Sequence, residues 1–346
     1  MDLSIASILL LDGITNGAVY ALLGLATVLV FTVTRVIFIP QGEFVAYGAL
    51  TLAILQTGKV PGTVWLLLIL AFVAAMMDVA AEWKRHPRLL PALKAGLRTL
   101  VVPAVVAGVT VIVAPTQPHL AIQALLSVAI VTAYGPLVYR VAYQSLADAT
   151  SLVLLIVSVG VHFAMTGLGL LFFGAEGFRN PPFWDMRLNL GPIAITGQMI
   201  IIGIALVALI AMLWMFFERS LYGKALRATA VNRLGARLMG ISSQTAGQMT
   251  FAMAALIGAL SGLLIGPSTT VFYDSGFLIG LKGFVAAVIA GLSSYPGALI
   301  GAMFVGVVES FGSFWASAFK EVIVFTMILP ILLWRSLTSG HSDEEH

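Results

Sequence analysis

The sequence lacks cysteine and has few charged residues. The absence of cysteine from all 346 residues excludes disulfide bonds and thiolate metal or redox centres. Charged residues make up only 10% of the chain, whereas soluble domains carry about 25%. The phosphate-binding pattern G-x-x-x-x-G-K-[ST], the zinc pattern H-E-x-x-H and the nucleophile pattern G-x-S-x-G are also missing. We therefore expect no enzyme activity, no resident cofactor or metal, and no nucleic-acid partner.

Apolar residues dominate the chain from end to end. They make up 60% of it, and the mean hydropathy is +1.04. This composition predicts an all-α, polytopic membrane helix bundle, with residues 1–346 forming one transmembrane domain in the lipid bilayer. About ten or eleven spans are expected, and turn signals at Pro40-Gln41-Gly42 and Ser294–Gly297 predict short or broken helices near 38–56 and 277–314. The expected spans lie near 6–34, 38–56, 62–82, 98–116, 118–140, 149–174, 196–217, 247–271, 277–294, 297–314 and 317–335.

Lysine and arginine fall mostly on one side of this map. The most basic loop, 218–248, has one acidic residue, Glu218, and the bases Arg219, Lys224, Arg227, Arg233 and Arg237. Basic loops stay in the cytoplasm, so we predict an outside N-terminus and a cytoplasmic C-terminus. Lys282 is one of the few bases assigned to an outer segment, near 272–282. The acidic tail, 336–346, is predicted to be disordered.

The basic loop also contains helix start and stop signals. Asn232 can cap a short helix, Gly240 can end it in a left-handed conformation, and Ser242 can cap the next span. A short helix between two spans suits docking of a partner protein. The alternative is a solvated basic loop that only anchors the topology.

Two further loops each allow two interpretations. Residues 82–98 mix bases with leucines, which fits an amphipathic segment on the inner interface or a plain cytoplasmic loop. The outer loop at 174–195 contains Phe183 and Trp184. It could receive an external partner or serve as an interfacial anchor.

Ionisable residues inside spans are candidate functional residues because each is costly in lipid. Glu43 follows the Pro40-Gln41-Gly42 break and either lines a substrate path or makes a structural hydrogen bond. His162 forms a polar stripe with Ser158 and Thr166, and the same two interpretations hold.

Three other acidic residues lie in or near spans. Asp78 is predicted to pair with Lys84 or Arg85, and Glu309 is predicted to be packed with its carboxyl satisfied. Asp148 is a further intramembrane candidate. A proton-coupled transporter would have a richer set of such groups, so their scarcity argues against ion coupling.

Several stretches resemble one family. These are GITNGAVYALLGLATVLVFTVTRVI and GEFVAYGA, then LYGKALRATAVNRLGARLMGI, FAMAALIGALSGLLIGP and GFLIGLKGFVAAVIAGLSSYPGALIGAMFVGVVES. They are similar to the permeases of bacterial branched-chain amino acid ABC transporters. The resemblance covers the chain except for about 80–138, which is interpreted as an insertion with about two extra spans. It implies that 218–248 is the cytoplasmic coupling loop, with contacts to an ATPase from Arg227, Asn232, Arg233, Arg237 and Gly240.

The resemblance also implies a function and partners. The chain is expected to form half of the pathway of an ATP-driven importer in the bacterial inner membrane. Its partners would be a second permease subunit, two cytoplasmic ATPase subunits and a periplasmic substrate-binding protein. The substrate would be a branched-chain or related amino acid, with Gln41, Glu43 and His162 as candidates for the substrate path. Phe38 and Gln41 stand where relatives carry asparagine and histidine, which leaves open an aromatic or amide-like substrate.

Two functions from other classes remain as alternatives. An ion-coupled secondary transporter would act without ATPase subunits and would use Glu43 and Glu309 for coupling. A membrane-embedded enzyme is disfavoured by the missing catalytic constellations.

Overall fold

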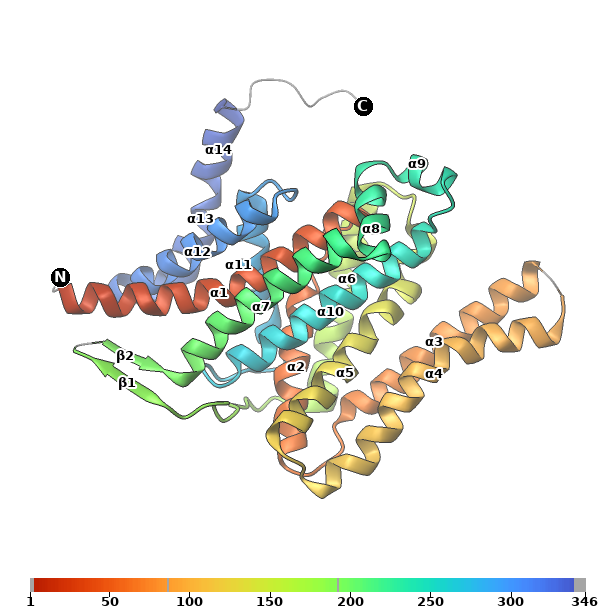
Figure 1. Cartoon of the computed structure of the whole chain (residues 1–346), viewed down its shortest axis with the longest axis horizontal. Coiled ribbons are helices and arrows are strands. Elements are labelled where there is room, and N and C mark those ends of the chain that lie inside the picture. Colours follow the sequence, from red (N-terminus) through yellow and green to blue (C-terminus); the bar gives the residue numbers. More distant parts are fainter. Residues whose placement is uncertain (1–2, 86, 192, 339–346) are drawn as a thin grey trace.

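The computed structural model describes residues 3–85, 87–191 and 193–338. The chain is almost entirely helical, as the composition predicted (Figure 1). The helices are α1 (Leu3–Thr34), α2 (Gln41–Gln56), α3 (Gly62–Arg85), α4 (Leu89–Val113), α5 (Leu120–Val138), α6 (Ser151–Phe173), α7 (Gly197–Arg219), α8 (Leu221–Val231), α9 (Arg233–Leu238), α10 (Ser243–Ile265), α11 (Ser275–Ile289), α12 (Tyr295–Ala316), α13 (Lys320–Thr326) and α14 (Ile328–Thr338). Two strands, β1 (Arg187–Leu190) and β2 (Ile193–Thr196), form an antiparallel ribbon that the sequence analysis did not predict.

Within the described residues, eight helical stretches are long and apolar enough to cross a membrane. The chain is therefore a polytopic membrane protein. The shorter helices α2 and α11 account for two further predicted spans. The last predicted span, 317–335, is divided between α13 and α14, and α14 continues to Thr338. The first three residues of the predicted tail are thus helical, and its remainder lies outside the described residues.

Helix α2 is short and lies at the centre of the bundle. The chain leaves α1 at Arg35, whose φ of 61° is left-handed, and continues without helix to Pro40. All but two of the 16 residues of α2 are buried, because α5, α10 and α11 pack around it. This confirms that the helix near 38–56 is short, and non-helical backbone before it is tolerated because protein surrounds it.

Glycine allows the backbones of neighbouring helices to approach each other. A Cβ on Gly306 of α12 would lie 2.3 Å from the carbonyl oxygen of Gly13 on α1. A Cβ on Gly42 of α2 would lie 1.8 Å from the carbonyl oxygen of Gly276 on α11. These contacts have no room for a side chain, so the small-residue patterns of the sequence mark true helix crossings.

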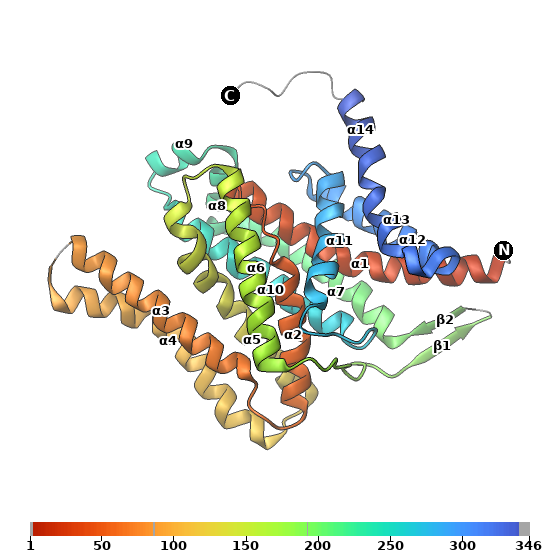
Figure 2. The same cartoon turned by 180° about the vertical axis from the view of Figure 1, so that it is seen from behind.

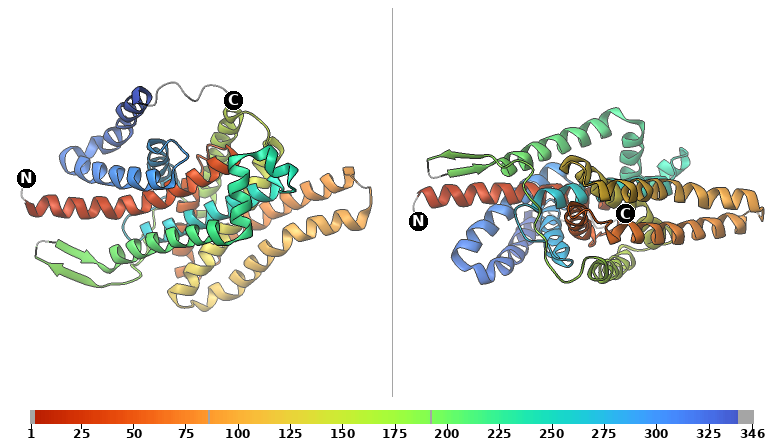
Figure 3. Two further views of the ribbon diagram at one scale, coloured as in Figure 1. Left: turned by 45° about the horizontal axis from the view of Figure 1, so that its top comes forward. Right: turned by 90° about the horizontal axis from the view of Figure 1, so that it is seen from below.

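The two ends of the bundle differ. The α9 end carries α8 and α9, which lie at the upper right of Figure 1. The ribbon end carries β1, β2 and the N-terminal end of α1, which lie together in both views of Figure 3. An isolated bridge between Phe178 and Val271 fastens the segment before β1 to the loop after α10.

Helices α3 and α4 form an antiparallel hairpin that stands away from the bundle (Figure 2). Of residues 82–98, those that the structure describes form the end of α3 and the first turns of α4, so they belong to this hairpin. Asp78 forms an ion pair with Arg140 and accepts a hydrogen bond from Thr99, so the predicted pairing with Lys84 is wrong. The side chain of Arg85, the other predicted partner, lies outside the described part of the structure. Helices α4 and α5 both lie within 80–138, and the interpretation of this stretch as an insertion stays a prediction.

Candidate functional site

The segment between α7 and α10 folds into two short helices with well-defined ends. The Ser220 hydroxyl accepts a hydrogen bond from the Gly223 amide and caps α8. The Asn232 Oδ1 accepts a hydrogen bond of 2.8 Å from the Gly235 amide and caps α9. Gly240 has a φ of 84° and ends the turn after α9, where a residue with a Cβ would be strained. Asn232 and Gly240 thus have the local roles that their residue types predicted.

Two arginines of α9 point back toward the bundle. Arg233 donates hydrogen bonds to the carbonyl oxygens of Ala147 (3.0 Å) and Thr34 (3.4 Å). Burial lowers the pKa of this guanidinium from its ordinary value. Arg237 pairs with Asp148 at 2.6 Å and donates to the Ser243 hydroxyl at 2.8 Å. Asp148 is exposed at the α9 end, so its assignment as an intramembrane residue is wrong.

The exposed side of α8 and α9 is apolar. Large side chains that would normally be buried are 68–84% exposed here, and they are Val231, Leu234, Leu238 and Met239. A hollow of about 500 Å³ between α8 and α9 has Val231 and Met239 in its wall. Sequence reasoning missed these residues because it considered the charges and the helix ends of the loop but not its apolar side chains. The signal was available as apolar residues four apart, Leu234 and Leu238, in a segment otherwise rich in bases.

Arg227, on α8, differs from the α9 arginines. It pairs with Glu218 at 2.8 Å, and both side chains are about half exposed. Such a pair contributes little stability and exchanges readily for another partner.

Two of the three substrate-path candidates, Glu43 and His162, are in contact, and the third, Gln41, lies two residues before Glu43 on α2. The Nδ1 of His162, on α6, lies 2.9 Å from the Oε1 of Glu43, and both residues are buried. Gln41 donates a hydrogen bond of 2.9 Å to the carbonyl oxygen of Ala254 on α10. Two oxygens, the Oε2 of Glu43 and the Oε1 of Gln41, are buried without a hydrogen-bond partner. Unpaired buried acceptors are costly, so a donor group would be stabilised next to either oxygen.

The ring of Phe38 contacts other aromatic rings, and its backbone carbonyl accepts a hydrogen bond from the Gln41 amide. The Phe38 ring packs against Phe44, Tyr143 and Phe251, with centroids 4.8–5.9 Å apart. All four rings are buried. Phe38 therefore joins an aromatic cluster between α2, α10 and the chain after α5, which explains why an apolar ring is accepted at this position.

A second buried ionic cluster joins α11 and α12. Lys282 pairs with Glu309 at 2.6 Å and with Glu321 at 3.2 Å, and the Tyr20 hydroxyl donates to Glu309 at 2.6 Å. Lys282 is only 5% exposed and belongs to α11, so it is a buried base of the bundle, and the outer position assigned to it stays a prediction. The packed and satisfied carboxyl predicted for Glu309 is present.

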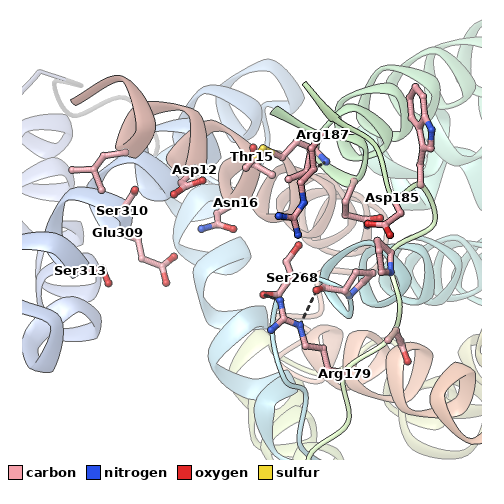
Figure 4. Close-up of a pocket in the computed structure, with 18 of the residues that line it drawn as sticks. Asp12, Thr15, Asn16, Arg179, Asp185, Arg187, Ser268, Glu309, Ser310 and Ser313 are labelled. Atoms are coloured by element: carbon pink, nitrogen blue, oxygen red, sulfur yellow. Dashed lines mark hydrogen bonds between the residues drawn. The ribbon is translucent and has the colours of Figure 1, made fainter. Parts of the chain in front are cut away.

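A cavity of about 840 Å³ opens at the ribbon end (Figure 4). Side chains of both charges line it from four regions of the chain, and the labelled ones are Asp12, Thr15, Asn16, Arg179, Asp185, Arg187, Ser268, Glu309, Ser310 and Ser313. Arg179 donates to the carbonyl oxygen of Pro267 at 3.0 Å, which fixes one wall. Trp184 also lines the cavity, and Phe183 lies beside it in the chain.

The sequence is similar to known membrane transport proteins. Residues 96–332 match the family described as "Branched-chain amino acid transport system / permease component". The high-affinity branched-chain amino acid transport system permease protein BraD of Pseudomonas aeruginosa is 30% identical over 216 residues, which covers 60% of this chain and 70% of BraD. The corresponding permease LivH of Escherichia coli is 30% identical over 214 residues, with 60% and 70% covered.

A more distant relative and one solved structure also match. A probable branched-chain amino acid transport permease LivH of Methanocaldococcus jannaschii is 24% identical over 159 residues, covering 45% of this chain and 50% of that protein. The solved structure, PsaBC from Streptococcus pneumoniae in complex with Fab, is 13% identical and covers 93% of this chain and 89% of its own, with a TM-score of 0.39. That likeness carries no argument. The family match over residues 96–332 and the 30% identity to BraD establish that the chain belongs to the permease components of branched-chain amino acid transport systems.

Proposed function

We propose that this chain forms half of the translocation pathway of an ATP-driven importer for branched-chain or related amino acids. Its partners are a second permease subunit, two ATPase subunits in the cytoplasm and a periplasmic substrate-binding protein. The complex lies in the bacterial inner membrane, with the α9 end in the cytoplasm and the ribbon end outside. The basic residues of the α9 end support this orientation.

The observation that carries the proposal is the apolar surface of α8 and α9. Helix α9 is too short to cross a membrane, and yet Leu234, Leu238 and Met239 are more than two thirds exposed. Exposed apolar side chains rimmed by polar groups mark interaction sites. An ATPase subunit that buries this surface on the cytoplasmic side explains both the exposure and the nearby bases.

The hydrogen bonds of Arg233 give this surface a mechanical connection. They join α9 to the last residue of α1, Thr34, and to Ala147, which lies between α5 and α6. Movement of α9 with a bound ATPase would therefore displace the ends of these spans together. Rocking of spans about a central site is how alternating access works in many transporters.

The site around α2 is the proposed substrate path. The unpartnered oxygens of Glu43 and Gln41 accept hydrogen bonds, so they suit the ammonium group of an amino acid. His162 holds the other oxygen of Glu43 and orients the carboxyl. The ring of Phe38 packs against three other aromatic rings, and this cluster accounts for an aromatic residue at the position without an aromatic substrate.

The test is ATP hydrolysis by the purified complex in the presence of the loaded binding protein. Leu238→Asp places a charge in the proposed contact, and we expect lost co-purification of the ATPase and a fall in transport-coupled hydrolysis of tenfold or more. Gln244→Asp, an exposed change at the start of α10, is the matched control and should leave both unchanged. Normal hydrolysis with Leu238→Asp would contradict the proposal. Uptake by this chain alone in vesicles without nucleotide would instead favour the ion-coupled alternative.

A further inference from the structure

An apolar groove of about 590 Å³ runs between the membrane helices and α8. This volume lies in the range of about 300–1,000 Å³ that is common for small-molecule sites. Its walls come from α1, α7, α8 and the start of α12. The apolar lining residues are Leu25, Val33, Ile210, Leu213, Trp214, Phe217, Leu226, Ala230, Val231, Tyr295, Pro296 and Leu299.

Only three of the described residues that line the groove are polar or charged. Thr32 and Ser293 add hydroxyl groups, and Arg227 is the one charged residue in the described lining. Arg227 stands on α8, beyond the last residue of α7, and the exposed bases Arg219 and Lys224 lie near it in the chain. Glu218 is the only acidic residue among residues 218–248. One end of the apolar groove thus carries a guanidinium, in a segment of the chain whose bases outnumber its single acidic residue.

The wall formed by α7 faces outward from the bundle. Trp214 is 61% exposed and Ile210 is 36% exposed, although both belong to a helix apolar enough to span a membrane. Such side chains contact lipid when the helix is in a bilayer. The groove is therefore reached from the acyl-chain region, and its charged end is at the level of the headgroups.

We propose that the groove binds an anionic phospholipid, with one acyl chain along α1, α7 and α12 and the phosphate at Arg227. A phosphate accepts paired hydrogen bonds from a guanidinium and suits the excess of positive charge. The Arg227–Glu218 pair is half exposed and gives way at little cost. A zwitterionic phospholipid with acyl chains of the same length has no net negative charge, so it should bind more weakly at Arg227 than the anionic lipid does.

A lipid in this position would connect α8 with three spans. Leu226 and Val231 of α8 lie in the same groove as Leu25 of α1 and Leu299 of α12. The bound chain would thus help to fix α8 against the bundle, so membrane composition would affect how firmly α8 is held. Lipid binding itself requires no ATPase subunit and does not rest on the proposed importer function.

Quenching of tryptophan fluorescence measures binding directly, because Trp214 lines the groove. The full chain is placed in nanodiscs of phosphatidylcholine that contain increasing fractions of either brominated phosphatidylglycerol or brominated phosphatidylcholine. Bromine quenches tryptophan on contact, and subtraction of the Trp214→Phe protein isolates the signal of Trp214. We expect the brominated anionic lipid to half-quench Trp214 at a fraction about fivefold lower than the zwitterionic lipid.

Two variants separate the headgroup from the acyl chain. Arg227→Gln should abolish the preference for the anionic lipid and leave quenching by both lipids, whereas Ala230→Phe, which fills the groove, should weaken quenching by both. Arg88→Gln, an exposed arginine at the tip of the α3–α4 hairpin, is the control and should retain the full preference.

Three results would overturn the proposal. The first is equal quenching of the unaltered protein by the two lipids, and the second is an intact preference in Arg227→Gln. The third is absence of Trp214 quenching by either lipid, which would mean that protein, such as a second permease copy, covers the groove. If the Ala230→Phe protein fails to fold, the proposal is still tested, because the first two results come from the unaltered protein and from Arg227→Gln.

Discussion

Charged side chains at the α9 end and in the interior of the bundle differ in burial and in their expected contribution to stability. In the interior, Lys282 and Glu309 pair at 2.6 Å and Glu43 meets His162 at 2.9 Å, with all four residues buried. At the α9 end, arginines point inward and leave leucine and methionine facing outward. Because the interior charges are buried, removal of one partner leaves the other charge uncompensated and should cost much stability. The α9 charges are closer to solvent, so each ion pair there contributes little to stability. Substitutions in the two regions should therefore differ most in their effect on stability.

The largest effect is expected for Lys282→Met. It removes the cation that pairs with both Glu309 and Glu321, in a place where the Lys282 side chain is only 6% exposed, and leaves only the more distant Lys320 near Glu321. Removing one partner of a buried pair costs about 3–5 kcal/mol. Thermal unfolding in detergent would measure the loss. Lys320→Met, a change of an exposed lysine 4.0 Å from Glu321, should have little effect, and similar losses for the two variants would contradict the assignment.

A smaller effect is expected for Arg233→Gln. The shorter side chain loses the hydrogen bonds to Ala147 and Thr34, and hydrogen bonds from charged groups contribute about 1.5–3 kcal/mol when buried. Because Arg233 is only partly buried, the lower end of this range applies. Hydrogen exchange should become faster in 233–240 while the spans keep their protection. Arg219→Gln, which changes an exposed arginine at the end of α7, is the control.

Next comes Asn232→Ala, which removes the cap of α9. Loss of an N-cap side chain costs about 1 kcal/mol, and the Gly235 amide would lose its partner. Limited proteolysis of 232–242 should speed up several-fold, and Asn232→Ser should restore most of the protection. Equal cleavage of the alanine and serine variants would show that the cap does not hold α9.

The smallest effect on stability is expected for Arg227→Gln. Its pair with Glu218 is half exposed, and exposed pairs contribute at most about 1 kcal/mol. The melting temperature should therefore hardly change, at low or at high salt. A large destabilisation would show that Arg227 belongs with the buried pairs, and it would remove the contrast between the two regions.

Composition and apolar runs were enough to predict the membrane bundle. Helix ends inside the basic loop were also predictable, because the cap at Asn232 and the left-handed turn at Gly240 depend on local residue types. The contact between Glu43 and His162 joins residues 119 positions apart. The sequence could therefore mark each residue as a candidate but could not predict that they are in contact.

The errors have a shared physical origin. Lys282 was treated as a loop base when the spans were counted, and only its partners on α12 and α13 explain its burial. Asp78 was paired with its nearest bases in sequence, whereas it forms its ion pair with Arg140. The ribbon of β1 and β2 was missed because its strands have only four residues each.

The most direct test of the account is the accessibility of position 238. Because the chain has no native cysteine, Leu238→Cys gives a single reactive thiol on the exposed side of α9. The account predicts that a membrane-impermeant maleimide labels this thiol only from the cytoplasmic side, and that the bound ATPase subunit protects it. Labelling from outside intact cells, or labelling that the ATPase does not change, would contradict the account.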